Sequence, residues 1–125
     1  MNFIQTFSPL VGRVFISLIF IVTGIGKITG YSGTAAYMDS VGIPGMLLPL
    51  VILLEVGGGL AILLGFKTRL VAFLLAGFCV LSALIFHFDF DNQMQFLMFM
   101  KNIAIAGGFL FLVAFGPGKY AIDNR

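Results

Sequence analysis

The chain has 125 residues, of which 60% are hydrophobic and 10% are charged, and its mean hydropathy is +1.12. Because so little polar surface cannot cover a soluble globule of this size, the composition indicates a membrane protein. The net charge of +2 comes from scattered basic residues and argues against nucleic-acid binding, while the single cysteine, Cys79, excludes an intramolecular disulfide and dithiol exchange within the chain.

Four apolar runs each approach the ~20 residues that a helix needs to cross a bilayer. In chain order they cover residues 10–28, 46–66, 70–88 and 96–115. We therefore expect an all-α fold, an integral membrane four-helix bundle that forms a single domain over residues 1–125. Arg13 lies inside the first run and no small-residue cleavage site follows before Lys27, so we expect this run to be retained rather than removed as a signal peptide.

The first helix carries a line of residues spaced alternately by four and three positions, which places them on one face. We expect this face to point into the bundle. The line consists of Arg13, Ser17, Phe20, Gly24 and Lys27.

The stretch between the first two runs, residues 29–45, is too polar to span a membrane. It mixes small polar residues with Tyr31, Tyr37 and Met38, which is typical of a segment at the membrane interface. We expect it to cap one end of the bundle. A second polar stretch, residues 87–93, joins the third and fourth helices at the same end.

Glu55 lies near the middle of the second run, where a carboxylate without a partner is costly. At ~1.5 Å per residue, Glu55 lies ~12 Å and Lys101 ~7 Å below the outer surface. We expect Lys101 to be its partner, because Lys27 sits close enough to a helix end to extend toward the headgroups. Two interpretations stay open. In the first, Glu55 only fixes helix register, either paired with Lys101 or protonated and hydrogen-bonded to a Ser, Thr or Tyr; in the second, it is a functional carboxylate.

His87 ends the third run, close to Asp89 and Asp91 in the following loop. A lone histidine at a helix end is more often a surface residue than a ligand. These three residues in a short flexible stretch lack the fixed geometry of a zinc site, and one histidine cannot provide bis-histidine haem ligation. We therefore expect no metal site, and no nicotinamide or flavin fingerprint indicates an intrinsic cofactor.

Small residues recur at spacings of three and four in the second and fourth runs, where they allow membrane helices to approach closely. Plain close packing explains most of them, and we assign them no chemistry. A single four-helix bundle of this size does not obviously need so many small residues for close packing. We therefore expect some of them, such as Gly58 or Gly107, to lie at a homo-oligomeric interface.

Three stretches together resemble the DoxX family of small bacterial inner-membrane proteins. They are FIVTGIGKITGYSGTAAYMDSVGIPG, ILLEVGGGLAILLGFKTR and KNIAIAGGFLFLVAFGPG, and the similarity covers about Leu10 to Asp123. The most specific elements are the G-x-x-K-x-x-G at Gly24, Lys27 and Gly30, Glu55 followed by small residues, G-F-x-T-R at residues 65–69, Lys101 with Asn102, and Gly116-Pro117-Gly118. The resemblance implies an inner-membrane location and, for some members, an association with quinones or oxidative stress.

Basic residues predict the orientation in that membrane. Five of the seven fall on one side of the predicted topology, and Lys27 and Lys101 fall on the other. Because loops rich in Lys and Arg stay in the cytoplasm, we expect both termini to be cytoplasmic. The five are Arg13, Lys67, Arg69, Lys119 and Arg125.

Two functional hypotheses follow, and they leave open whether the protein is itself an enzyme. The first is a redox accessory whose outer-leaflet cavity, lined by Lys27, Glu55, His87 and Lys101, binds a quinone or similar amphiphile for itself or for a membrane or soluble partner reductase. A quinone requires an apolar slot with a hydrogen-bond donor at each carbonyl. The alternative is a non-enzymatic structural subunit, chaperone or small-solute carrier of the membrane.

Overall fold

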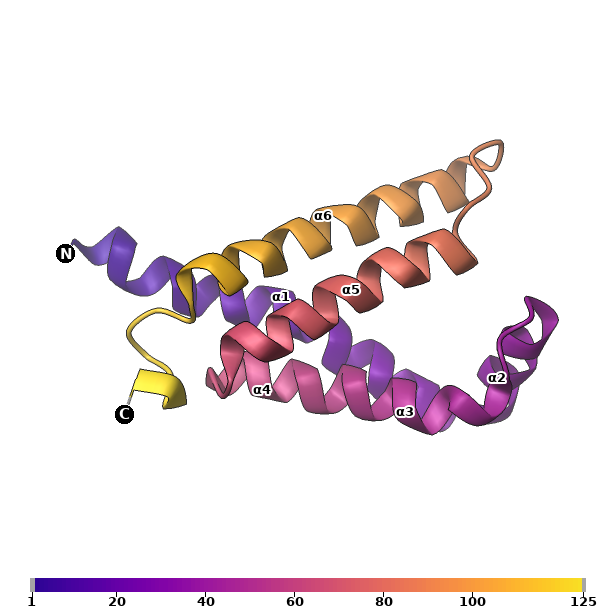
Figure 1. The fold of residues 1–125 in the computed structure, drawn as a ribbon, viewed down its shortest axis with the longest axis horizontal. Helices are drawn as coiled ribbons and strands as arrows, with labels where there is room; N and C mark the ends of the chain where they lie inside the picture. The colour runs from indigo at the N-terminus through magenta and orange to yellow at the C-terminus, as the bar shows by residue number, and fades with distance from the viewer. Residues whose placement is uncertain (1, 125) are drawn as a thin grey trace.

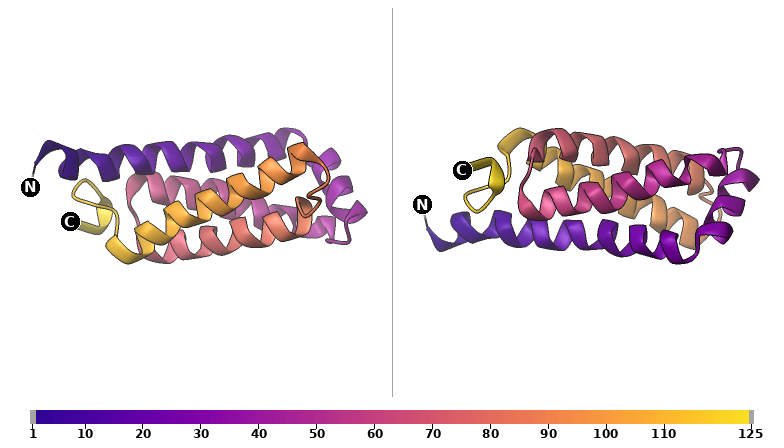
Figure 2. Two further views of the ribbon diagram at one scale, coloured as in Figure 1. Left: turned by 90° about the horizontal axis from the view of Figure 1, so that it is seen from above. Right: turned by 90° about the horizontal axis from the view of Figure 1, so that it is seen from below.

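Four helices long and apolar enough to cross a membrane dominate the computed structural model, which describes residues 2–124 (Figure 1). They cover Phe3–Thr29 (α1), Gly45–Leu64, Thr68–Phe86 (α5) and Gln93–Phe115 (α6). The expected all-α four-helix membrane fold is confirmed. The two described chain ends lie at one end of the bundle, and the short helix α2 (Tyr31–Ser40) lies at the other (Figure 2).

α1 begins at Phe3, well before the expected residue 10. The reason is an N-cap, because Oδ1 of Asn2 accepts a hydrogen bond from the main-chain N–H of Gln5 at 2.8 Å. Farther along α1, the line predicted to face the bundle does so, with Lys27 half-buried at its end. Its fully buried members are Arg13, Ser17, Phe20 and Gly24.

The predicted capping segment contains a helix, α2, over Tyr31–Ser40. Two contacts fix α2 across the end of the bundle. The ring of Tyr37 stacks on Phe86 of α5 with the centroids 5.6 Å apart, and Oδ1 of Asp39 accepts a hydrogen bond from Gly45 N at 2.7 Å. The segment therefore closes one end of the bundle as its composition predicted.

The second span is not a uniform α-helix. It begins with a 3-10 turn (η1, Gly45–Leu47), continues as α3 (Leu48–Ile52), passes through a π-helical turn (η2, Leu53–Gly57) and ends as α4 (Gly58–Leu64). A π turn inside a helix accommodates one extra residue and is frequent at functional sites. Glu55 lies in this π turn.

α1 packs against η2 and α4, while α5 and α6 form an antiparallel hairpin that joins the other pair mainly through α4 (Figure 1). Because lipid provides no hydrophobic drive between helices, close packing holds them together. Gly24 shows how close α1 approaches, since a Cβ there would lie 3.2 Å from the main-chain nitrogen of Val56. The buried core consists of Phe20, Ile62, Ala72, Leu75, Ala76, Cys79, Ala106 and Phe109.

Arg13, only 1% exposed, joins three parts of the chain at the end that carries the termini. Its guanidinium donates to the carbonyl oxygens of Ile62 and Leu63 at 3.2 and 3.0 Å, and also to that of Tyr120. The first two carbonyls belong to the last turn of α4, where carbonyls have no partner within the helix. Arg13 therefore caps α4 and holds the C-terminal segment beside it.

Asp123 makes the matching contact with α5. Its carboxylate accepts hydrogen bonds from the main-chain N–H groups of Lys67 and Thr68 at 2.6 and 2.8 Å, which caps the N-terminus of α5. The main-chain N–H of Asp123 in turn donates to the carbonyl of Gly65 at 2.9 Å. We call residues 116–124 the C-terminal strap, because these contacts bind the segment across the turn between α4 and α5.

Candidate functional site

A cavity of ≈ 540 Å³ lies in the half of the bundle that α2 covers. The cavity lies where α5, which packs against α4, diverges from α3 toward this end of the bundle (Figure 1). Most of the wall is apolar. The side chains with polar or titratable groups in the lining are Thr23, Lys27, Thr34, Tyr37, Glu55, Cys79, Ser82, His87, Lys101 and Asn102.

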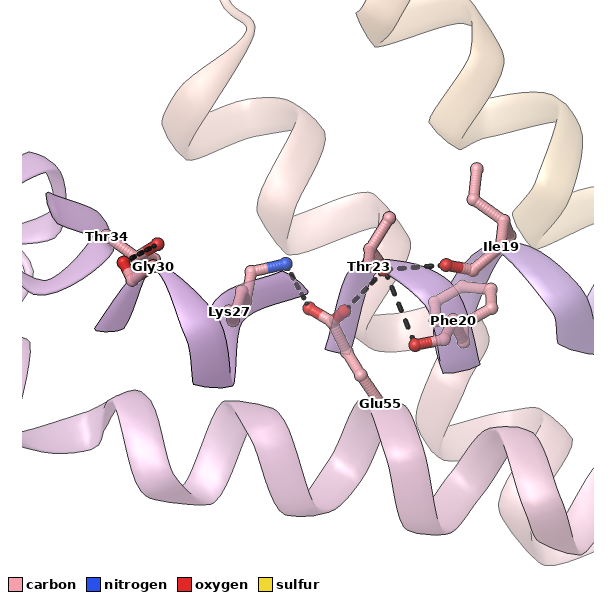
Figure 3. A network of polar contacts seen from close by, with 7 residues as sticks. All are labelled: Ile19, Phe20, Thr23, Lys27, Gly30, Thr34 and Glu55. Atoms are coloured by element: carbon pink, nitrogen blue, oxygen red, sulfur yellow. Dashed lines mark hydrogen bonds and ion pairs between the residues drawn. The ribbon is translucent and has the colours of Figure 1, made fainter. Parts of the chain in front are cut away.

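Glu55 is 2% exposed, and both of its carboxylate oxygens have partners on α1 (Figure 3). Oε1 accepts from Nζ of Lys27 at 2.7 Å, and Oε2 lies 2.7 Å from Oγ1 of Thr23. Lys27 and Thr23 are four residues apart, so they share a helix face and bracket the carboxylate. Gly24 on the same face makes this possible, because a Cβ there would lie only 3.2 Å from Cβ of Glu55.

The hydroxyl of Thr23 can support Glu55 in either protonation state. Its Oγ1 also lies 2.7 Å from the carbonyl oxygen of Ile19, but a hydroxyl has one hydrogen to donate. With Glu55 ionised, the hydroxyl donates to Oε2. With a proton on Oε2 of Glu55, the carboxyl would donate to Oγ1 and the hydroxyl to Ile19. Both partners of the hydroxyl lie within reach in the structure (Figure 3).

The expected pairing of Glu55 with Lys101 is wrong. Glu55 pairs with Lys27 instead, because the η2 turn packs against α1 whereas α6, which carries Lys101, packs against α5. Lys27 keeps 29% of its side chain exposed but directs its ammonium to the carboxylate rather than to the headgroups. Lys101 is half-buried and lines the same cavity.

The charge of the cavity follows from this arrangement. Lys27 and Glu55 neutralise each other at 2.7 Å, while Lys101 forms no ion pair with any described residue. The cavity therefore carries one ammonium without a counter-charge, next to the amide of Asn102 on α6. Such a wall favours a ligand with electron-rich oxygen atoms or a negative charge.

His87 also lines the cavity, just beyond the last residue of α5. Its Nδ1 lies 2.7 Å from Oε1 of Gln95. With Oε1 of Gln95 as the partner, Nδ1 is the donor of this hydrogen bond, because an amide oxygen only accepts. The four residues expected at the site, Lys27, Glu55, His87 and Lys101, thus line one cavity, whereas Asp89 and Asp91 are exposed outside it.

Thr23, Ser82 and Asn102 are lining residues that the sequence analysis did not single out as site residues. The spacing of Thr23 and Lys27 on one helix face was the available signal for Thr23, because two polar residues four apart in an apolar helix mark a polar stripe. Ser82 is an isolated small polar residue, and no pattern in the sequence distinguishes it from packing residues.

Two of the three similar proteins described here are named as inner membrane proteins. The DoxX family profile matches residues 8–88. Inner membrane protein YqjF of Escherichia coli (strain K12) is 54% identical over 99% of this chain and 95% of its own length, and Inner membrane protein YphA of the same strain is 37% identical over 93% and 88%. A Bacillus subtilis (strain 168) protein with the name "Putative oxidoreductase CatD" is 28% identical over 79% and 77%. No solved structure matches the chain significantly.

Proposed function

The chain belongs to the DoxX family of inner-membrane proteins, and from this premise we propose that it binds a quinone or a similar ring-bearing amphiphile in the cavity beneath α2, as an accessory to a redox enzyme. The observation that carries the proposal is a largely apolar cavity with the Lys27–Glu55 pair on one wall and Lys101 on another. The oxidoreductase in the name of the 28% identical relative supports the redox part of the proposal.

The cavity suits a ligand that arrives from the bilayer. Leu50 on α3 and Leu81 on α5 both line it and are 63% and 60% exposed. Their exposed surface faces lipid in a membrane-spanning bundle, so the mouth between α3 and α5 opens sideways into the bilayer. The volume of ≈ 540 Å³ lies within the usual range of small-molecule sites. An amphiphile can insert its ring and leave its tail in the lipid.

The polar groups suit a ring with an oxygen at each end. Lys27 keeps further N–H donors on the side of α1, beside Glu55 on the second span, while Lys101 and Asn102 present donors from α6. A quinone places one carbonyl at each end of its ring, so each side can donate to one oxygen. Reduction to the quinol takes up two electrons and two protons. In this proposal a partner reductase supplies the two electrons, protonated Glu55 gives one proton to one carbonyl oxygen, and Lys101 gives the second proton to the other. Both groups then regain their protons from water.

A structural role is the second candidate, and the same ion pair favours it. The contact between Lys27 and Glu55 joins α1 to the second span and would by itself fix their register. On this view the protein is a structural subunit, chaperone or carrier, and the cavity is filled by lipid chains.

Quinone binding to the purified protein distinguishes the two roles. Lipid extracts are analysed for co-purified quinone by mass spectrometry, and a short-chain quinone is titrated into the parent, Glu55→Gln, Lys101→Met and the control Asp91→Asn, which changes an exposed carboxylate outside the cavity. We expect co-purified quinone, and a loss of affinity of about tenfold or more in the two cavity variants only. Absence of binding to the folded parent would refute the proposed function and leave the structural role.

A further inference from the structure

A second pocket, of ≈ 780 Å³, lies at the opposite end of the bundle, where the C-terminal strap meets the turn between α4 and α5. α4 ends there at Leu64, α5 begins at Thr68 and α6 ends at Phe115. Three spanning helices therefore terminate around this pocket, which places it at the depth of the lipid headgroups. Exposed aromatic side chains at the same end, Phe66 and Tyr120, are typical of that depth.

Among the described residues, three cations line this pocket, Lys67, Arg69 and Lys119, and Asp123 is the one carboxylate in the lining. Nζ of Lys67 lies 5.8 Å from the ring centroid of Phe66, and Nζ of Lys119 lies 5.6 Å from that of Tyr120. These cation–π contacts keep the ammonium groups beside the interfacial rings.

The guanidinium of Arg69 lies against Gly116 in the strap. A Cβ at Gly116 would be only 3.2 Å from Nη2 of Arg69. Gly116 also has φ +77°, a left-handed conformation that favours glycine. Glycine at this position therefore leaves room for the Arg69 guanidinium beside the pocket.

The N-terminus of α5 adds hydrogen-bond donors to these cations. Thr68, the first residue of α5, lines the pocket and is fully buried, with its hydroxyl beside the carboxylate of Asp123. Asp123 occupies the N–H groups of Lys67 and Thr68, but the following N–H groups of α5 still have no partner within the helix. A phosphate oxygen could accept from these groups.

From this arrangement we propose that the pocket binds the headgroup of an anionic phospholipid, with its phosphate between Arg69, Lys67 and Lys119. A lipid fits better than a free phosphate ion because exposed apolar residues continue the pocket along the helices. Leu70 and Phe115 belong to the lining and are exposed on the outer faces of α5 and α6, where the acyl chains of the same lipid would lie. The bound lipid would fix this end of the bundle at the headgroup layer. The proposal does not depend on the function proposed for the other cavity.

Native mass spectrometry of the full chain in detergent, with palmitoyl-oleoyl phosphatidylglycerol or the matching phosphatidylcholine, tests this directly. We expect tighter binding of phosphatidylglycerol, weakened by salt, and a loss of about fivefold in affinity for each of Arg69→Gln and Lys119→Gln. Asp91→Asn, which changes one exposed charge at the other end of the bundle and lies outside both pockets, should retain the preference. Equal binding of the two lipids to the parent, or an unchanged preference in the folded Arg69→Gln/Lys119→Gln protein, would overturn the proposal.

One further measurement identifies the ligand group. Millimolar inorganic phosphate should leave the bound lipid in place, and displacement of the lipid by phosphate would assign the pocket to a free ion and refute the lipid site.

Discussion

Nζ of Lys27 lies 2.7 Å from Oε1 of Glu55, which joins α1 to the π turn of the second span. The two partners are unequally buried, since the carboxylate side chain is 2% exposed and the lysine side chain 29%. A buried carboxylate that loses its cation either remains charged at high cost or takes up a proton. The pair therefore couples the packing of α1 to the protonation of Glu55.

Removal of Lys27 should destabilise the bundle. We expect Lys27→Met to lower the free energy of unfolding by roughly 2–3 kcal/mol, below the ~3–5 kcal/mol for a fully buried pair, because Lys27 is partly exposed and Glu55 can protonate. The double variant Lys27→Met/Glu55→Gln should lose less than the sum of the two single variants. Reversible unfolding in mixed micelles measures all three, with Lys101→Met as the control. A loss in Lys101→Met equal to that in Lys27→Met would contradict the observed pairing.

Thr23 should contribute through its hydroxyl alone. Thr23→Val keeps the branched shape but removes the group that bonds Oε2 of Glu55, so we expect a loss of about 1–2 kcal/mol in unfolding free energy. Thr23→Ser, which retains the hydroxyl, should stay close to the parent. Infrared difference spectra of the carboxyl band during a pH titration provide a second readout, because the valine variant alters hydrogen bonding to Glu55. Identical spectra for Thr23→Val and the parent would show that the contact does not act on the carboxyl.

The sequence predicted some features of this site and missed others, and the difference depends on how far apart the interacting residues lie in the chain. Hydropathy and spacing were sufficient for the four spans and for the buried line on α1, since both depend on residues close in the chain. The partner of Glu55 depends on which helices are neighbours and on a π turn, and neither follows from local periodicity. The contact between Arg13 and Tyr120 joins residues 107 positions apart, so the strap could not be inferred from any local pattern.

The C-terminal strap should loosen in acid. Burial raises the pKa of Asp123, but hydrogen bonds from the main-chain N–H and the hydroxyl of Thr68 and from the main-chain N–H of Lys67, together with the charge of Arg13, outweigh it. They hold this pKa below its ordinary value. A lowered pKa stabilises the folded state at pH values above the ordinary pKa of about 4, and that contribution disappears as the pH falls through the lowered value. The protection factors of residues 116–124 in hydrogen exchange, which correct for the slower intrinsic exchange in acid, should therefore fall below about pH 4.

The variant Asp123→Asn is the control for this pH dependence. It should show faster exchange of the strap at neutral pH and a smaller change on acidification, because its side chain does not titrate in this range. A strap that loosens equally in the parent and in Asp123→Asn as the pH falls would assign the effect to another group.

We propose that the protein self-associates and that the interface involves Gly107 rather than Gly58. Gly58 is buried inside the bundle, where a Cβ would lie 3.2 Å from the side chain of Leu75, whereas a Cβ at Gly107 would meet nothing within 4 Å. Gly107→Leu should therefore fold and change the oligomer size in detergent, measured by light scattering. Gly77→Leu is the matched control, because the site on α5 is equally open. A parent that is monomeric in both detergent and nanodiscs would exclude the interface.

Orientation in the membrane is the remaining prediction, with both termini in the cytoplasm. Ser32 on α2 and Asn92 at the start of α6 are exposed at the end away from the termini, so both should face outward if the basic end lies inside. Single cysteines at these positions in a Cys79→Ala background should react with an impermeant maleimide in intact cells. A cysteine at Lys119 should react only after permeabilisation. The reverse pattern would place the quinone-sized cavity in the cytoplasmic leaflet, and a partner reductase would then have to reach it from that side.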